Sequence, residues 1–284
     1  VQTCALPICT IFLQSAATLD TSACTWNNVT SVPNGPTYTL NSNLNIGGAF
    51  AINATTAGQT LNMGNNNINL GGNLTINTSS GNTTQNVGTG AIVINGSGTQ
   101  TWSMPSRTTS SLRINLTISN PNFVVSGTVG YATGTIAGTA AATLGGTIVV
   151  NNNTTFNTST VTFNNLTFNA SATITVSSDL NVAGTLTVSS TPVTFNSSTI
   201  YFASLFIGGG GTQQVSGSSN WVANGTGSLI MLNTCRLDCT GSFTINTTGT
   251  VTIPATDGSG NLSVFAFGKD RKSTRLNSSH EWIS

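Results

Sequence analysis

The chain carries the stretch LNIGGAFAIN at Leu44–Asn53 and a second copy, INLGGNLTIN, at Ile68–Asn77. Both copies read apolar, polar, apolar, any residue, Gly, any residue, apolar, any residue, apolar and a closing Asn or Ser. Three further copies follow the pattern at Ala142–Asn151, Leu180–Ser189 and Leu237–Asn246. Internal repetition of this kind predicts a repeat architecture, in which each unit packs on its neighbours.

Alternation of apolar and polar residues predicts that the repeats are β-strands. The segments Thr160–Phe163 (TVTF), Thr173–Val176 (TITV) and Thr185–Val188 (TLTV) alternate strictly. A period of two places the aliphatic side chains on one face of a strand and Thr or Asn on the other. A composition rich in Ser, Thr, Asn and Gly is also typical of disorder, but disordered chains lack this alternation of β-branched residues.

The spacing of the copies favours a solenoid over separate modules. Leu44 and Ile68 open copies 24 residues apart, which is suitable for one coil of a β-helix. Two longer stretches, Ile68–Ser80 and Ser97–Ser103, also align with sequences about 112 residues later, which predicts a duplicated block of coils. We therefore expect an all-β fold, a right-handed parallel β-helix (β-solenoid). Tandem β-sandwiches are the alternative.

The repeat also predicts which residues face the interior. The first, third, seventh and ninth positions are expected to stack into one continuous apolar column. The fifth position is Gly in every copy, which predicts a bend with no room for a Cβ atom or a positive φ. The closing Asn is expected at a turn, where stacked amides form ladders. The inward positions are Leu44, Ile46, Phe50, Ile52, Ile68, Leu70, Leu74, Ile76, Leu180, Val182, Leu186, Val188, Leu237, Cys239, Phe243 and Ile245.

Composition excludes several function classes. Only 5% of the 284 residues are charged, with seven Lys or Arg, six Asp or Glu and one His, against a usual share of about 25%. A nucleic-acid partner is not expected, because the chain has no basic stripe to neutralise phosphates. The acidic residues do not cluster as a calcium site requires. No apolar run reaches the roughly 18 residues that a membrane span needs.

Both ends of the chain resemble translated adapter DNA rather than the sequence of a natural protein. Asp270–His280 (DRKSTRLNSSH) resembles the translation of a common short-read sequencing adapter, and Val1–Ile8 (VQTCALPI) resembles its reverse complement. We therefore expect residues 1–8 and 269–284 to be adapter-derived and the remainder to be an internal gene fragment. Within the fragment, 9–43 is expected to be a leading segment or cap, and 44–268 the solenoid repeats.

The run from Thr25 to Gly48 (TWNN…VPNGPTYTLNSNLNIGG), with GAIVINGSGTQTWS and FNNLTFNASATITVSSDLNVAGTLTV, resembles secreted bacterial β-strand-repeat surface proteins. These are autotransporter-like and filamentous-haemagglutinin-like adhesins. The resemblance implies a right-handed β-helix, secretion to the cell surface or the extracellular space, and a role in display or adhesion. Phage tail-fibre and tailspike proteins have the same kind of β-strand repeats. The partners implied are glycans, host surfaces or abiotic surfaces.

Acidic residues give weak support for catalysis. Asp179 and Asp238 are the best candidates for an acid–base pair in a polysaccharide-cleaving β-helix. Both lie where other copies carry Asn or Ser, so capping of a turn explains them more simply, and Arg236 adjoins Asp238. We therefore expect no enzyme, and no catalytic, cofactor-binding or metal-binding residues.

Cysteine, aromatic and threonine residues complete the candidates. Cys9 and Cys24 form a possible disulfide, whereas Cys239 matches Leu70 in the repeat and is expected in the core with Cys235 unbridged. The aromatic residues are scattered and are expected to pack in the core. Threonine pairs do not recur at one coil period, which disfavours ice binding. The aromatic residues are Trp26, Trp102, Trp221, Tyr38, Tyr131 and Tyr201; the threonine pairs are Thr160/Thr162, Thr173/Thr175, Thr185/Thr187 and Thr250/Thr252.

Overall fold

The fold is a parallel β-helix, or β-solenoid, as the repeats predict. A computed structural model describes residues 10–21, 24–31, 37–54, 59–78, 83–104, 111–169, 172–189, 192–196, 198–208, 213–231, 235–252 and 265–267. Within these ranges the regular secondary structure consists of β-strands alone, and the strands pair in parallel into three sheets. Tandem β-sandwiches are therefore wrong for this chain, because sandwich sheets are antiparallel. The segments expected to derive from an adapter, 1–8 and 269–284, lie outside the described residues.

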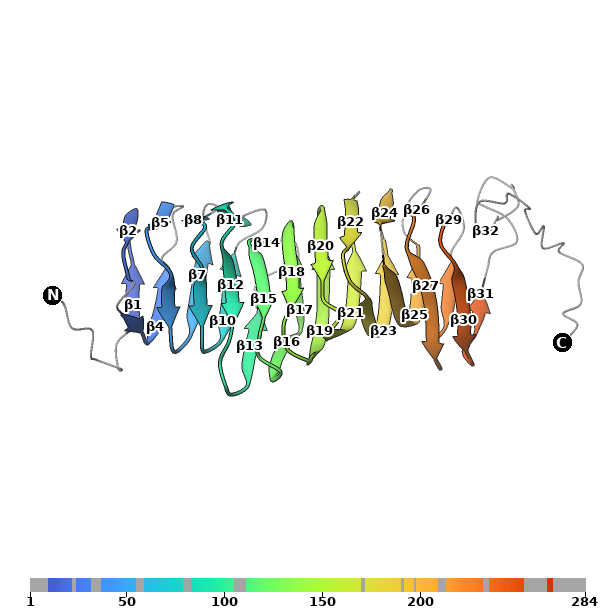
Figure 1. Ribbon diagram of the computed structural model, residues 1–284, viewed down its shortest axis with the longest axis horizontal. Helices are drawn as coiled ribbons and strands as arrows, with labels where there is room; N and C mark the ends of the chain where they lie inside the picture. The colour runs from blue at the N-terminus through green and yellow to red at the C-terminus, as the bar shows by residue number, and fades with distance from the viewer. Residues whose placement is uncertain are drawn as a thin grey trace, which may run out of the picture.

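The chain visits the three sheets in turn, so each sheet is a stack of strands from successive coils (Figure 1). The first sheet contains β1 (Thr10–Leu13), β4 (Asn28–Ser31), β7 (Phe50–Ala54), β10 (Leu74–Thr78), β13 (Gln100–Ser103) and β16 (Phe123–Ser126). The third contains β3 (Thr25–Trp26), β6 (Leu44–Ile46), β9 (Ile68–Leu70), β12 (Ala91–Ile94), β15 (Asn115–Ile118), β18 (Gly134–Gly138), β20 (Thr154–Asn157), β22 (Ala172–Val176), β24 (Val193–Asn196), β26 (Gln213–Gly217), β29 (Cys235–Cys239) and β32 (Phe265–Phe267).

The second sheet has the most strands. Some of its strands begin on the side of the coil that the first sheet occupies and continue round the corner. It contains β2 (Ala17–Leu19), β5 (Thr37–Leu40), β8 (Gln59–Gly64), β11 (Thr83–Gly88), β14 (Ser111–Arg113), β17 (Thr128–Tyr131), β19 (Ala142–Val150), β21 (Val161–Phe168), β23 (Leu180–Val188), β25 (Thr199–Ile207), β27 (Asn220–Gly225), β28 (Leu229–Met231), β30 (Phe243–Thr247) and β31 (Val251–Thr252). The pairing of β19, β21, β23 and β25 shifts register part-way, where each strand bends. Beyond β25 the two halves separate again, because β27 pairs with its first half and β28 with its second.

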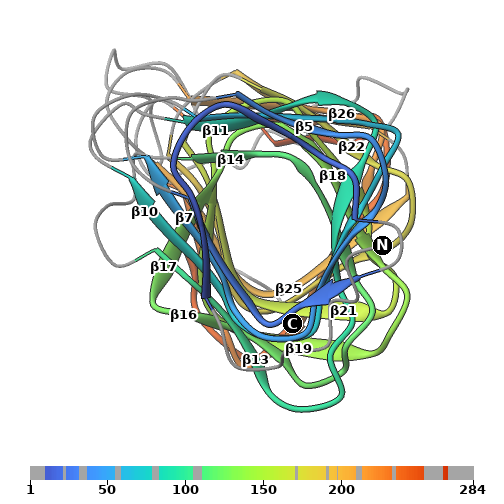
Figure 2. The same cartoon turned by 90° about the vertical axis from the view of Figure 1, so that its left-hand side faces the viewer.

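The coils form one elongated, right-handed rod. Figure 1 shows them side by side along the long axis, and Figure 2 looks down that axis from the N-terminal end. In Figure 2 the chain turns clockwise from β16 through β17 to β18 as it moves away from the viewer. The described strands of residues 10–40 pair in the same three sheets as the later coils, so the rod includes this part of the leading segment.

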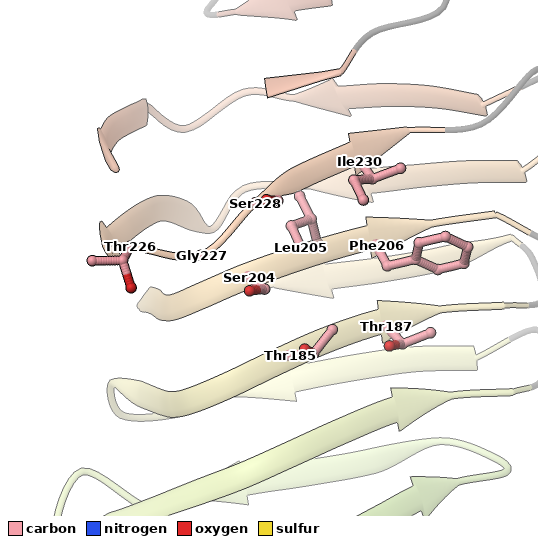
Figure 3. A pocket seen from close by; sticks show the side chains of 9 residues that line it. All are labelled: Thr185, Thr187, Ser204, Leu205, Phe206, Thr226, Gly227, Ser228 and Ile230. Atoms are coloured by element: carbon pink, nitrogen blue, oxygen red, sulfur yellow. The ribbon is translucent and has the colours of Figure 1, made fainter. Parts of the chain in front are cut away.

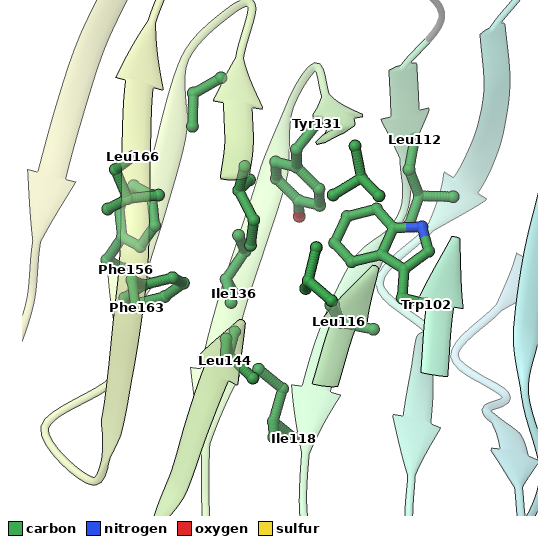
Figure 4. Packing of buried hydrophobic residues seen from close by; sticks show 14 of the residues in the cluster. Trp102, Leu112, Leu116, Ile118, Tyr131, Ile136, Leu144, Phe156, Phe163 and Leu166 are labelled. Carbon is green, nitrogen blue, oxygen red and sulfur yellow. The ribbon is translucent and has the colours of Figure 1, made fainter. Parts of the chain in front are cut away.

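The interior is one continuous apolar cluster. The predicted inward positions of the copies that open at Leu44, Ile68 and Leu180 are all buried. Figure 4 shows how residues such as Trp102, Leu116 and Ile136 from different sheets meet inside the coils. Apolar burial on this scale is the main favourable term in the stability of the rod.

One predicted inward residue is exposed. Ile245, in the last complete copy, has 45% of its surface exposed, and Phe243 beside it is only partly buried. Their strand, β30, pairs with β27 on one side, and no other described strand covers its second side. The prediction of burial is therefore wrong for Ile245. The side chains of Leu237 and Cys239 lie outside the described residues.

The copies do not form a single column, and this corrects the sequence prediction. The copies at Leu44 and Ile68 run from the third sheet into the first, whereas those at Ala142 and Leu180 occupy the bent strands β19 and β23. The expected 112-residue duplication is also wrong. Gln100–Ser103 lies in the first sheet, but its counterpart in β26 lies in the third. At least two different corners of the coil use the same alternation around a glycine, so sequence similarity does not identify the corner.

A chain of aromatic contacts runs through the C-terminal half of the interior. Phe168 and Phe195 meet edge to face with ring centroids 5.0 Å apart, and Phe195 meets Trp221 at 5.1 Å. The chain of contacts continues from Trp221 to Phe202 at 5.9 Å. Edge-to-face pairs of this kind contribute beyond their buried area, by about 0.5–1.5 kcal/mol each.

The glycine positions of the repeat are corners where successive coils touch. Gly146 has a φ of 66°, which disfavours residues with a side chain. A Cβ atom added to Gly72 would meet the Gly48 carbonyl in the coil below and lie 2.9 Å from the nitrogen of Ala49. The prediction of a bend with no room for Cβ is thus confirmed.

Asparagine side chains join one coil to the next. The closing residues Asn53 and Asn77 lie within β7 and β10, so the expectation that they sit at a turn is wrong. The Asn28 side-chain oxygen accepts a hydrogen bond from the backbone N–H of Ala49 at 2.7 Å, and Asn115 does the same for Thr135 at 2.9 Å. The predicted amide ladder is confirmed where Asn77 Nδ2 donates to Asn53 Oδ1 at 2.9 Å. Uncharged amides therefore satisfy polar groups that the stacking of coils would leave unpaired.

Gln100 is the most connected of the buried amides. Its Nε2 donates to the carbonyl oxygens of Leu70 (2.8 Å) and Gly72 (2.6 Å), and its Oε1 accepts from Gly96 N (2.6 Å) and Asn120 Nδ2 (2.7 Å). The side chain is 1% exposed. All of its polar atoms have partners, so the network links neighbouring coils without leaving a buried polar group unsatisfied.

Substitution of Gly72 by Ala is expected to lower the free energy of unfolding by about 2 kcal/mol, because the new methyl group forces two coils apart. The matched control is Gly98→Ala, since an added Cβ there meets nothing within 4 Å. Urea denaturation followed by circular dichroism measures both. Equal stability of the two variants would contradict the proposed close contact of coils.

Substitution of Gln100 by Ala is expected to lower the free energy of unfolding by about 2 kcal/mol, because the partly buried Gly72 carbonyl and Gly96 N–H lose the partner that the buried amide provides. Gln214→Ala in β26 is the control, since this residue is only partly buried and alternates with buried Val215. The same denaturation experiment distinguishes them. A Gln100→Ala variant as stable as the control would show that the network contributes nothing.

Candidate functional site

A shallow depression lies on the outside of the second sheet, over β23, β25 and β28 (Figure 3). Its volume is about 420 Å³. The nine lining residues are Thr185, Thr187, Ser204, Leu205, Phe206, Thr226, Gly227, Ser228 and Ile230.

Parallel register lines up the residues of the depression in two columns. In the first, Thr187 pairs with Phe206 and Phe206 pairs with Ile230, so three successive coils present these residues side by side. In the second, Thr185 pairs with Ser204. Alternation along β25 buries Leu205 and leaves Phe206 partly exposed. The depression therefore combines an apolar strip with a parallel row of hydroxyl groups.

The corner between β27 and β28 forms one end of the depression. A Cβ atom on Gly227 would collide with the carbonyl of Ala203, so only glycine permits this close approach to the coil below. The Ser228 carbonyl accepts a hydrogen bond from Leu205 N at 3.0 Å, which continues the stacking. The backbone thus sets the shape of the depression.

The lining side chains are hydroxyl-bearing or apolar, apart from Gly227, and none carries a charge. Acid–base hydrolysis of a glycosidic bond uses a pair of carboxyl groups about 5–10 Å apart. These nine residues do not provide such a pair. They are suited to binding a neutral ligand that has both apolar and hydroxyl surfaces.

The acidic candidates are placed at corners where the structure describes them. Asp179 is half-buried and accepts a hydrogen bond from Thr199 N at 3.2 Å, so it joins two successive coils as Asn28 does, and no hydrogen bond among the described residues caps its own turn. Exposed Asp20 accepts one from the Ser42 hydroxyl at 3.0 Å. The side chain of Asp238 lies outside the described residues, so the structure does not place it relative to Asp179.

The cysteine predictions are mostly untested. Cys24 is half-buried and has a free thiol. Because the Cys24 thiol is free, the disulfide from Cys9 to Cys24 is not formed in this structure; Cys9 itself lies outside the described residues. Cys235 and Cys239 begin and end β29, but the description does not extend to their side chains. Among the described residues no three His, Cys, Asp or Glu lie close enough to hold a metal ion.

Five of the six Trp and Tyr candidates lie in or against the core, as predicted, but the prediction is wrong for Tyr201, which is partly exposed between buried Ile200 and Phe202. Trp102, Trp221, Tyr38 and Tyr131 are fully buried, and Trp26 packs against the core. Sequence reasoning missed Phe206. It lies in a run, TIYFASLFI, where several apolar residues follow one another, so the exposed member cannot be identified before the register is known.

Threonine residues stack more regularly than the sequence suggested. Thr135, Thr155 and Thr175 pair in register across three coils of the third sheet. Single threonines therefore recur at the coil period at this place, but the Thr-X-Thr pairs do not, because Thr155 belongs to no such pair. The next residue of the column is Asn196, so the rank ends after three coils.

Comparisons with known proteins give no relative: no protein-family model, curated protein or solved structure matches this chain significantly. Within the described part of the chain, no helix is long and apolar enough to cross a membrane. The site must therefore be interpreted from its own chemistry.

Tyr131 is the titratable group that the fold perturbs most clearly among those described. Its hydroxyl donates to the carbonyls of Ile114 (3.0 Å) and Thr135 (3.2 Å), and burial raises its pKa well above the ordinary value. The phenol is thus a neutral structural donor in the folded chain.

Stability is expected to fall as the pH rises above about 10, because the unfolded chain then releases the Tyr131 proton and the folded chain retains it. Tyr131→Phe should cost about 1 kcal/mol at neutral pH. The substitution should also reduce the fall in unfolding free energy above pH 10 by about 1.4 kcal/mol per pH unit. Urea denaturation between pH 7 and pH 11 measures both effects. An unchanged alkaline slope in the variant would contradict this role.

Proposed function

We propose that this chain is a structural and adhesive β-helix segment of an extracellular protein of bacterial origin, without catalytic activity. The observation that supports it most is the combination of a continuous apolar interior with an exterior of amides and hydroxyls. Such a rod is rigid, and its side faces offer a long, uncharged contact surface. The resemblance to secreted bacterial adhesins supports the extracellular location.

The enzyme alternative receives less support. Asp20 precedes β3 in the first described coil, whereas Asp179 lies between β22 and β23. With about 4.8 Å between stacked strands, the two carboxylates lie roughly 35 Å apart along the rod. A catalytic pair requires a separation of about 5–10 Å. These two acids therefore do not act together, and no described observation favours a phage tail fibre over a bacterial adhesin.

Adhesion can be tested with beads coated with the purified chain. We expect more of these beads than of control beads coated with serum albumin to be retained on a mucin, cellulose or polystyrene surface. Retention should change little between 0.1 M and 1 M NaCl, because a surface with few charges is insensitive to screening. Retention no better than albumin on every surface would contradict adhesion, and release of sugars from the mucin or cellulose would contradict the absence of catalysis.

A further inference from the structure

Phe206 is an aromatic residue in a column whose three preceding members are not aromatic. The preceding coils have Val149, Thr167 and Thr187 at the equivalent outward positions, and these positions pair in register with one another. A threonine therefore meets every requirement of the sheet there. Phe206 instead places a partly exposed ring between Thr187 on the preceding coil and Ile230 on the following coil.

The ring lies next to hydroxyl groups at a regular spacing. Thr187 precedes it in its own column, and Thr185 and Ser204 form the column beside it. Residues two apart on a strand are about 6.6 Å apart, and successive coils are about 4.8 Å apart. Both columns run along the rod axis. An extended ligand lying along the axis would meet the ring and the hydroxyl row over consecutive coils.

A pyranose ring has the complementary chemistry. Its axial C–H groups form an apolar face that packs on the electron-rich face of an aromatic ring, and its equatorial hydroxyls exchange hydrogen bonds with Ser and Thr. The lining residues carry no charge, so they offer no opposite charge to the carboxylate or sulfate groups of an anionic polymer. A second copy of the chain fits poorly, because a stable protein interface needs about 800 Å² from each partner and the depression involves nine residues.

We infer that the depression on β23, β25 and β28 binds a neutral polysaccharide, with a sugar ring stacked on Phe206 and its hydroxyls bonded to Thr187, Thr185 and Ser204. This site rests on the proposed adhesive function and identifies its ligand class. The strand register sets the direction of the bound polymer along the rod.

Binding is measured by isothermal titration and affinity electrophoresis with laminarin and dextran as neutral polysaccharides and alginate as the anionic one. The key variant is Phe206→Thr, which restores the residue type of the preceding coil and so preserves folding. Phe206→Trp retains an aromatic face. Tyr201→Ala is the matched control, because Tyr201 is a partly exposed aromatic residue on the same strand and lies outside the depression. Circular dichroism verifies that each variant is folded.

The inference predicts binding of laminarin or dextran and none of alginate. Phe206→Thr should weaken binding about tenfold, which corresponds to the loss of one good stacking contact. Phe206→Trp and Tyr201→Ala should stay within about twofold of the unaltered chain. Failure of both neutral polysaccharides to bind, tighter binding of alginate, or an equal loss in Phe206→Thr and Tyr201→Ala would overturn it.

The bead assay separates this inference from the proposed function. If beads with the unaltered chain adhere and Phe206→Thr beads adhere equally to cellulose, adhesion stands and the sugar site is wrong. If the unaltered beads adhere to no surface, the adhesive function itself fails, whatever the titrations show. Loss of adhesion to cellulose in Phe206→Thr alone supports both.

Discussion

The structure depends on one constraint: each strand must stack in parallel register on the equivalent strand of the coil before it. Register decides which side chains enter the interior, since a shift by one residue would turn the whole apolar set outward. It also brings the carbonyl and N–H groups of one coil opposite those of the next. In this chain Leu44 pairs with Ile68 and Asn45 with Asn69, so the core residues and the outward amides repeat together.

The corners hold the register in place. Glycines such as Gly48 and Gly72 allow two coils to touch where a side chain would hold them apart. Asn28 and Asn115 pair with backbone N–H groups of the following coil, and the amides of Asn45 and Asn69 pair with each other at 2.8 Å. These contacts use no charge. They explain how a chain with 5% charged residues can satisfy its polar backbone at every turn.

The sequence predicted the parts of the fold that depend on local pattern. Alternation identified strands and buried positions such as Ile76 and Leu186, and the fifth position of the repeat identified the tight corners. It did not show which corner each copy occupies, because the corners at Gly72 and at Gly184 both exclude a Cβ atom and so select the same pattern. Ile245 was expected to be buried since the pattern carries no information about where stacking stops.

The candidate site was beyond sequence reasoning for a related reason. Phe206 belongs to a run in which Leu205 and Ile207 are also apolar, and only the bend in β25 determines which of them faces out. Thr185, Thr187 and Ser204 are ordinary outward residues until the register places them around the ring. The site, like the core, therefore forms only when the coils stack. Its ligand would contact residues from several coils at once.

Disulfide trapping tests the register most directly. The account predicts that cysteines at Asn45 and Asn69, in a background with the native cysteines replaced by serine, form a disulfide on mild oxidation, because their Cα atoms are partners on adjacent strands. Cysteines at Asn45 and Val93 should not, because two strand spacings of about 4.8 Å separate them. Mass spectrometry of the digested protein identifies the bridge. A bridge from 45 to 93, or none from 45 to 69 in the folded chain, would contradict the coil-on-coil stacking.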